Sequence, residues 1–292
     1  MIPELKYILV SMRPKHWIKN IFLFPALIFS HNLFDFYLLA RVTGGFGLFC
    51  LAASSIYIFN DIKDIKKDQE HPEKSKRPLA QGHLKVNNAY TASIILAIIA
   101  LFGALLLDLT FFAILAAYVL MNIAYTIKIK QVVILDVFCI ASGFVFRVLA
   151  GTSLTGVQPS DWLIICTITI SIFLGFSKRR SELILGGANS SNHRQVLINY
   201  NIQFLDQMIS VASACTLMSY ALYTIADETV TRFGTRNLIF TLPFAIYGIY
   251  RYLYLNHQKQ MGGNPTIALL KDFPLFLNGL IWLGAVILII YY

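Results

Sequence analysis

Three aspartates, Asp61, Asp64 and Asp68, follow a long apolar stretch and lie within eight residues of sequence. On a helix that continued through them they would project at about 0°, 300° and 340°, so the three carboxylates would share one face. Like charges at this spacing repel one another, and a divalent cation would neutralise them. Mg²⁺ takes oxygen ligands, commonly one or two carboxylates together with substrate phosphates. We therefore predict that these aspartates are the catalytic residues and the Mg²⁺ ligands, with Asn60 at the edge of the same face. A solvated, charged helix end is the alternative.

Basic residues surround this cluster in the sequence. Lys74 and Arg77 follow it directly, and carboxylates with a metal beside Lys and Arg suit a diphosphate or a phosphorylated sugar. Taken singly, each basic residue also fits the ordinary loop charge of a membrane protein. The further candidates for substrate or phosphate binding are Lys19, Tyr125, Lys128, Lys130, Asp136, Lys178 and Arg179.

Arg147 stands inside an apolar segment, where a charged residue is costly and usually faces a partner or a polar cavity. Asp136 precedes it by 11 residues. At that spacing the two share a helical face but are separated by about 16 Å of rise. We expect them to line one face without pairing, and we add Arg147 to the substrate-binding candidates.

The elements that position these residues are membrane helices. Of the 292 residues, 57% are hydrophobic and 13% are charged, against about 25% charged in a typical soluble domain. This composition disfavours a soluble enzyme and a disordered chain. It also disfavours a nucleic-acid-binding domain despite the net charge of +9. We predict an all-α integral membrane protein that forms a single domain over residues 1–292.

Apolar runs long enough to cross a bilayer occur nine times. The predicted spans are 18–35, 38–59, 86–107, 110–125, 132–150, 162–177, 204–225, 237–255 and 273–292. Twenty of the 24 Lys and Arg residues then fall on one side of the membrane, three fall on the other, and Arg147 lies within a span. Because basic residues concentrate in cytoplasmic loops, we predict a cytoplasmic N-terminus and a cytoplasmic active face.

The acidic segment Asn60-Asp61-x-x-Asp64-x-x-x-Asp68 resembles the first Asp-rich motif of the UbiA prenyltransferase superfamily. Several weaker motifs together resemble the decaprenyl-phosphate phosphoribosyltransferase branch of that superfamily. They are Arg13-Pro14-Lys15-His16-Trp17-Ile18-Lys19-Asn20, His71-Pro72-x-Lys74-x-x-Arg77-Pro78, Ser142-Gly143-Phe144-x-x-Arg147-x-x-Ala150-Gly151, Lys178-Arg179-Arg180-x-Glu182-Leu183 and Gly262-Gly263-Asn264-Pro265.

This resemblance implies a UbiA-type bundle of nine transmembrane helices, with a central cavity that opens to the cytoplasmic face and laterally to the bilayer. It implies Mg²⁺-dependent transfer of 5-phosphoribose from phosphoribosyl diphosphate (PRPP) to a polyprenyl phosphate, with release of diphosphate, for cell-envelope polysaccharide precursors. The implied location is the cytoplasmic (inner) membrane. The resemblance leaves open whether the protein forms a homo-oligomer.

Two other functions stay open as well. Aromatic prenyltransferases of this superfamily join a polyprenyl diphosphate to a ring such as 4-hydroxybenzoate and carry a second acidic motif after span 6. Here that segment, residues 178–183, is basic, which favours a second anionic substrate. A transporter or lipid carrier without chemistry is the other alternative. Transporters often place ionisable groups at the membrane midplane, whereas these acids lie at a predicted span end.

Overall fold

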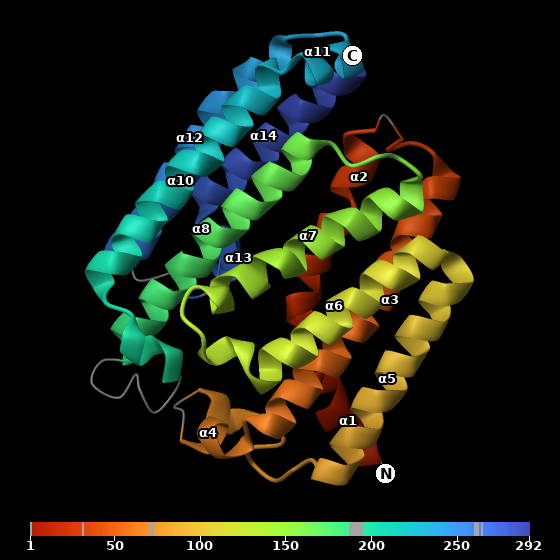
Figure 1. Cartoon of the computed structure of the whole chain (residues 1–292), viewed down its shortest axis with the longest axis vertical. Coiled ribbons are helices and arrows are strands. Elements are labelled where there is room, and N and C mark those ends of the chain that lie inside the picture. The colour runs from red at the N-terminus through yellow and green to blue at the C-terminus, as the bar shows by residue number, and fades with distance from the viewer. Residues whose placement is uncertain (1, 31, 71–72, 187–194, 260–262, 264) are drawn as a thin grey trace. The chain divides into compact units, whose positions relative to one another are not determined.

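The chain is described here by a computed structural model that covers all residues except 1, 31, 71–72, 187–194, 260–262 and 264. Over this described part the regular secondary structure is entirely helical (Figure 1). Contacts divide the chain into two compact units, residues 1–159 with 191–196, and residues 160–190 with 197–292. Each unit is considered by itself.

The first unit contains four long helices. They are α3 (Phe36–Lys63), α5 (Val86–Leu107), α6 (Leu109–Ile127) and α7 (Leu135–Thr155). Helix α3 packs against α5, α6 and α7. The shorter elements of the first unit are α1 (Ile2–Ser11), η1 (Pro14–Leu23), α2 (Pro25–Ile28), α4 (Ile65–Gln69), η2 (Lys74–Lys76) and η3 (Ile129–Gln131).

Polar caps set the ends of the long helices. Asp35 precedes α3, and its carboxylate accepts the backbone N–H groups of Tyr37 and Leu38. Asp108 caps α6 in the same way by accepting the N–H of Phe111. Such caps satisfy backbone donors that the first turn of a helix leaves without partners. The short connection between α5 and α6 is therefore a capped turn between two apolar helices.

The second unit consists of α8 (Asp161–Gly186), α10 (Ile202–Ile225), α12 (Leu242–Gln258) and α14 (Phe273–Tyr291). Helix α10 packs on α8 and on α12, and α12 packs on α14. The shorter elements of the second unit are α11 (Asp227–Phe233), η6 (Asn237–Thr241) and α13 (Pro265–Lys271). The sequence of η5 (Gln195–Asn199) includes the boundary between the two units.

Eight helical stretches in the described part are long and apolar enough to cross a membrane. They correspond to the second to ninth predicted spans, including the short one predicted at 110–125, which is α6. The count of nine is not confirmed, because the first predicted span, 18–35, does not form a long helix. In its place the chain forms η1 and α2, with Pro14 and Pro25 at the first turn of each. Proline in these positions starts a helix but cannot continue one.

This broken first segment is nevertheless firmly packed. Leu23 and Leu27 are fully buried in the core of the first unit, together with Phe49 of α3 and Phe111 of α6. A Cβ on Gly151 of α7 would lie 2.1 Å from the carbonyl oxygen of Leu23. Only glycine therefore permits this close approach of η1 to α7.

Candidate active site

The three aspartates lie where α3 ends, but they do not share one uninterrupted helical face. Helix α3 ends at Lys63, Asp64 forms the junction, and α4 begins at Ile65. Asp61 and Asp68 are buried, at 2% and 4% exposure, whereas the Asp64 side chain is 20% exposed. The single helix on which the shared face was argued is thus interrupted at Asp64. The structure holds Asp61 and Asp68 as a buried pair and Asp64 as a separate third carboxylate.

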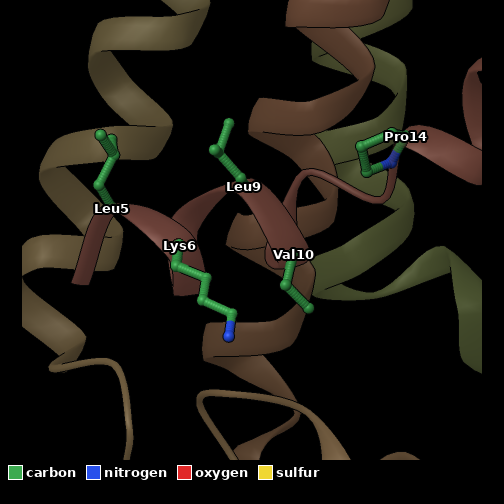
Figure 2. Close-up of a pocket in the computed structure, with 5 residues that line it drawn as sticks. All are labelled: Leu5, Lys6, Leu9, Val10 and Pro14. Carbon is green, nitrogen blue, oxygen red and sulfur yellow. The ribbon is translucent and has the colours of Figure 1, made fainter. Parts of the chain in front are cut away.

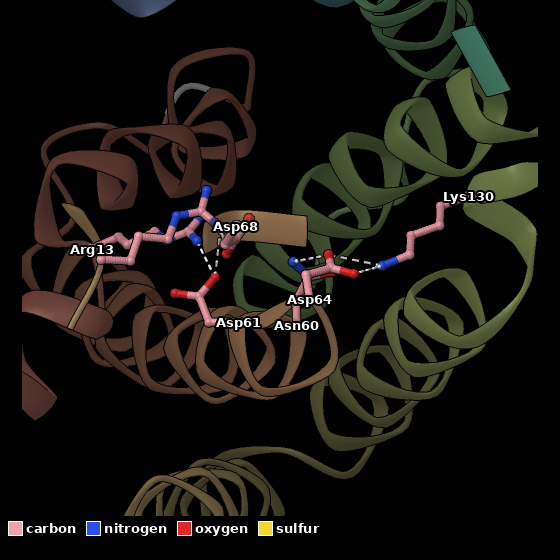
Figure 3. Close-up of polar contacts among 7 residues, drawn as sticks. Arg13, Asn60, Asp61, Asp64, Asp68 and Lys130 are labelled. Carbon is pink, nitrogen blue, oxygen red and sulfur yellow. Dashed lines mark hydrogen bonds and ion pairs between the residues drawn. The ribbon is translucent and has the colours of Figure 1, made fainter. Parts of the chain in front are cut away.

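Arg77 joins the buried pair. Its Nη1 donates to Asp61 Oδ1 at 3.0 Å and to Asp68 Oδ2 at 2.6 Å. Arg13, which precedes η1, donates to the same Asp61 oxygen. One guanidinium nitrogen thus bridges two carboxylates, and two arginines from distant segments meet at Asp61. In Figure 3 two dashed lines converge on one oxygen of Asp61.

The third acid has its own cation. Lys130 Nζ lies 2.7 and 2.8 Å from the two oxygens of Asp64, and Asn60 Nδ2 donates to Asp64 Oδ2 at 3.1 Å. Lys130 belongs to η3, directly after α6. In Figure 3 the side chains of Arg13 and Lys130 approach the acids from opposite sides. The loops after η2 and α6 therefore both reach the acidic cluster, as the distribution of basic residues suggested.

The electrostatics of the cluster follow from its burial. Burial raises the pKa of Asp68, and the neighbouring Arg77 guanidinium and Lys74 oppose this rise. Burial also lowers the pKa of Arg13, against the attraction of Asp61. Desolvation disfavours the charged form of each group, and opposite charges nearby restore it. The cations therefore oppose the effect of burial on Asp68, and burial remains the larger influence on its pKa.

Two residues of the first unit have strained backbones. Arg13 has φ 55° and Ile134 has φ 69°, and both lack the freedom of glycine. Conformations of this kind persist only where the surrounding structure enforces them, and they concentrate at functional sites. Arg13 is enforced by its contact with Asp61, while Ile134 immediately precedes α7 and the buried Asp136.

Arg147 is buried in α7 and is held by neutral partners. Its Nε donates to Asn20 Oδ1 at 2.8 Å, its Nη1 to the carbonyl of Gly143 at 2.6 Å, and its Nη2 to the hydroxyl of Tyr118 at 3.1 Å. The guanidinium carbon also lies about 5 Å from the ring centre of Phe49 and of Tyr118. Arg147 therefore connects the first segment to α7 and α6, a role that its sequence position did not reveal.

The remaining candidates of the first unit differ in exposure, and Lys74 among them interacts with the cluster. Lys74, in η2, acts on Asp68. Lys19 and Tyr125 are half-buried in η1 and α6, and Lys128 is exposed at the end of α6. Arg13 is a contact that the sequence did not predict, since it was named only as part of the Arg13–Asn20 motif. The conspicuous Arg13–Asn20 motif was the signal for it.

Lys178 and Arg179 belong to α8 in the second unit. Arg179 is fully buried, and its Nη1 lies 2.6 Å from Glu182 Oε2, while Lys178 Nζ lies 3.8 Å from Glu182 Oε1. The next residue, Arg180, donates to Asp206 at 2.5 Å. Ion pairs within the unit thus hold the basic run 178–180.

Part of the expected loop chemistry lies outside the described residues, namely His71, Gly262 and Asn264. Gly263 is described, and a Cβ on it would lie 3.6 Å from Cβ of Ser181. Gly263 therefore lies beside Ser181, which follows the basic run of α8.

The donor set at the acidic cluster suits a hard cation, because three carboxylates and the amide of Asn60 offer oxygen ligands, which Mg²⁺ prefers. In the described part of the chain no three His, Cys, Asp or Glu side chains are already gathered around one point. Arg77 Nη1 instead stands between the oxygens of Asp61 and Asp68 at distances of 3.0 and 2.6 Å. The residues fit a Mg²⁺ ion provided that the guanidinium moves aside.

Comparisons with known proteins agree with these observations. A family model described as the UbiA prenyltransferase family matches residues 21–262. The chain is 29% identical to the decaprenyl-phosphate phosphoribosyltransferase of Corynebacterium glutamicum, over 96% of this chain and 86% of that protein. It is 28% identical to the protein of the same name from Mycobacterium tuberculosis, over 94% of this chain and 91% of that one.

Solved structures show the same fold. A UbiA homologue from Archaeoglobus fulgidus bound to GPP and Mg²⁺ has a TM-score of 0.75 at 17% identity, covering 98% of this chain and all of that one. A structure of digeranylgeranylglyceryl phosphate synthase has a TM-score of 0.65 at 22% identity, covering 98% of this chain and 98% of that one.

Proposed function

The chain belongs to the UbiA prenyltransferase family, and we propose that it transfers 5-phosphoribose from PRPP to a polyprenyl phosphate, releasing diphosphate. The names of its relatives supply the phosphoribosyl group and the polyprenyl phosphate acceptor, and the motif resemblance suggests PRPP as the donor. The observation that carries the proposal is the acidic cluster of Asp61, Asp64 and Asp68, with Arg13, Arg77 and Lys130 in direct contact with it. A site of this mixed charge suits a metal-bound diphosphate, whose metal and phosphates need ligands of opposite sign.

The chain's own residues would act by exchanging partners. Asp61, Asp64 and Asp68 would turn their oxygens to Mg²⁺, and Asn60 would position the diphosphate beside it. Arg13, Arg77 and Lys130, released from the carboxylates, would then donate to phosphate oxygens, with Lys74 nearby. Mg²⁺, when bound, supplies positive charge that stabilises the departing diphosphate.

Transfer itself would rest mainly on positioning and charge neutralisation. The sugar carbon passes through an oxocarbenium-like state as its bond to the diphosphate breaks, as in glycosyl transfer generally. An acceptor phosphate is already anionic near neutral pH, so the site needs no strong general base.

The second anionic substrate would meet basic residues rather than a second acidic motif. We propose Lys178, whose side chain is 38% exposed, as a contact for the lipid phosphate, with Lys19, Tyr125 and Lys128 as further phosphate contacts. Arg179 is enclosed and held by Glu182, so its role in substrate binding would be to support Lys178. Asp136 and Arg147 would support the site from α7.

We further propose that the active face is cytoplasmic, in the cytoplasmic membrane, and that the two compact units act as one catalytic domain. The support for the orientation is the concentration of basic residues in the loops on the side of the acidic cluster.

The test is a transfer assay with the purified full chain in lipid nanodiscs. PRPP labelled in the ribose is incubated with polyprenyl phosphates of several lengths, and lipid products are identified by mass spectrometry. We expect a phosphoribosylated lipid that disappears with EDTA and returns with Mg²⁺. Asp64→Asn should lower the rate by about 10²-fold, the scale for losing one charge-stabilising group, whereas Asp227→Asn, an exposed acid of α11, should leave it unchanged.

Two results would overturn this proposal. Prenylation of an aromatic acid without transfer of the ribose label would identify an aromatic prenyltransferase. Binding of polyprenyl phosphate without any covalent product under these conditions would identify a lipid carrier.

A further inference from the structure

Helix α1 presents an apolar face that the protein does not cover. Leu5, Leu9 and Val10 are 60%, 51% and 53% exposed, and Lys6 is exposed between them. At 100° per residue these four side chains lie at about 0°, 40°, 140° and 100° around the helix, which is less than half of its circumference. The uncovered face is therefore continuous, with one cation within it.

The opposite face of α1 is fixed to the rest of the first unit. Tyr7 stacks on His83 with ring centres 5.0 Å apart, and Asn88 of α5 donates to Glu4 at 2.8 Å. Ile8 packs against a core cluster that includes Ile62 of α3. These side chains lie at about 200° to 300°, away from the uncovered arc. The outward direction of Leu5 and Leu9 is thus set by contacts on the other side.

A shallow hollow of about 470 Å³ lies along the uncovered face. Its lining consists of Leu5, Lys6, Leu9, Val10 and Pro14. Figure 2 shows α1 crossing the view, with Leu5 and Leu9 pointing toward the upper edge of this face and Lys6 and Val10 toward its lower edge. The lining is aliphatic except for the Lys6 amine, and a lysine can lay its apolar stem along such a surface while its charge reaches outward.

The position of α1 places this face at the edge of the membrane. It packs where α3 ends, at Ile58 and Ile62, and where α5 begins, at Ala89. Farther along α5, Ile94, Ile95 and Ile98 are 50–60% exposed, as expected for side chains that face lipid in a membrane-spanning helix. The uncovered face of α1 therefore lies at the level where α3 and α5 meet the edge of the bilayer.

We propose that α1 is an interfacial helix that docks on the phospholipid bilayer. Leu5, Leu9 and Val10 lie among the upper acyl-chain segments, a chain from the leaflet occupies the hollow, and Lys6 contacts lipid phosphates. Helices with an apolar face and basic residues adopt this position in membranes. This inference is independent of the proposed reaction.

Bilayer contact at α1 also bears on the active site through the backbone. The N–H of Arg13 donates to the carbonyl of Val10 at 3.1 Å, and Arg13 then contacts Asp61. Bilayer contact that fixes the end of α1 therefore also fixes the position of Arg13, whose guanidinium contacts Asp61.

The test measures the depth of α1 in nanodiscs of phosphatidylcholine and phosphatidylglycerol. Leu9→Cys carries an environment-sensitive NBD fluorophore in a background in which Cys50, Cys139, Cys166 and Cys215 are replaced by alanine. Gln81→Cys, at an exposed turn, is the matched control. Phosphatidylcholine brominated near the headgroup or near the chain terminus serves as the quencher.

We expect the label at position 9 to show blue-shifted emission relative to position 81, and to lose more intensity with shallow than with deep bromine. Emission like that at position 81 would overturn the proposal. So would a blue shift without quenching, which would show that protein, such as a second copy of the chain, covers the face. Stronger quenching by deep bromine would place α1 in the bilayer core and would also contradict it.

Replacing Cys50 removes the sulfur that accepts a bond from Asn20, so this background could lose its fold. The label is therefore also introduced in a chain that lacks only the exposed Cys215, with the signal of the unsubstituted parent subtracted. The same outcomes decide the proposal in that background.

Discussion

Replacing Arg77 by alanine should weaken the protein without metal and strengthen its binding of Mg²⁺. In the structure Arg77 Nη1 lies between Asp61 and Asp68, whose side chains are only 3% and 5% exposed. Without the guanidinium, two buried carboxylates face each other and only Arg13 remains on Asp61. The same substitution removes the cation that a metal must displace, so the two effects have opposite signs.

The size of the effect follows from the geometry. Removing one partner of a fully buried ion pair costs about 3–5 kcal/mol. Arg77 is 23% exposed and Arg13 still compensates Asp61, so we expect a loss of about 2 kcal/mol. If Mg²⁺ recovers that energy, its dissociation constant falls by about 30-fold, since 1.4 kcal/mol corresponds to tenfold. Mg²⁺ at about 100 times its dissociation constant adds about 2.7 kcal/mol, enough to restore the variant.

The assay combines thermal unfolding in detergent, with and without Mg²⁺, and calorimetric titration of Mg²⁺ into the substrate-free protein. Arg232→Ala is the matched control, because Arg232 pairs with Glu228 at 3.4 Å on the surface and such pairs contribute about 0–1 kcal/mol. Weaker or unchanged Mg²⁺ affinity in Arg77→Ala, together with an unfolding temperature that Mg²⁺ does not restore, would refute the reasoning.

Three further substitutions test the scaffold. Gly151→Ala should destabilise the protein by about 1–3 kcal/mol through overpacking, because its Cβ would lie 2.1 Å from a backbone oxygen; an unchanged melting temperature would contradict the tight packing of η1 on α7. Arg147→Met should leave Asn20 Oδ1 and the Tyr118 hydroxyl without their donor, and a drop in melting temperature that Mg²⁺ and PRPP do not restore is expected; restoration by PRPP would instead show that Arg147 binds substrate. Asp272→Ala should lower the free energy of unfolding by about 1 kcal/mol, because α14 loses its N-cap. Hydrogen bonding from Arg251 lowers the pKa of Asp272. The stabilisation from the Asp272 carboxylate is therefore complete above the ordinary pKa of a carboxyl group. The difference in stability between wild type and Asp272→Ala should vanish as the pH falls through the lowered pKa.

Sequence reasoning worked where one local physical rule decides the outcome. The apolar runs from 38 to 292 became long helices because a chain in lipid must satisfy its backbone hydrogen bonds within each segment. The acidic residues were placed together because they are close in sequence. The reasoning failed at residues 18–35, where apolar composition suggested a span but Pro25 and the contacts of Asn20 produce a broken segment. Hydropathy averages over such a segment and does not register where its backbone bonds are interrupted.

The partners of the acids were predictable only in kind. Positive charge on the side of the acidic cluster follows from the basic loops, but the sequence could not show that Arg77 bridges two acids while Lys130 takes the third. That division depends on tertiary contacts. Lys130 reaches Asp64 from η3, whereas Arg77 reaches Asp61 and Asp68 from the loop after η2.

The broken first segment explains why Arg147 is misleading when it is considered alone. An arginine inside an apolar helix invites a role in binding a charged substrate. However, irregular backbone at membrane depth also needs polar partners from the protein around it. Arg147 donates to Asn20, and Ser54 of α3 receives Trp17 Nε1 at 3.0 Å and donates to the carbonyl of Met12 at 3.1 Å. The 13–20 and 142–151 motifs therefore contact each other through Asn20 and Arg147. This contact fixes the segment that positions Arg13 beside Asp61.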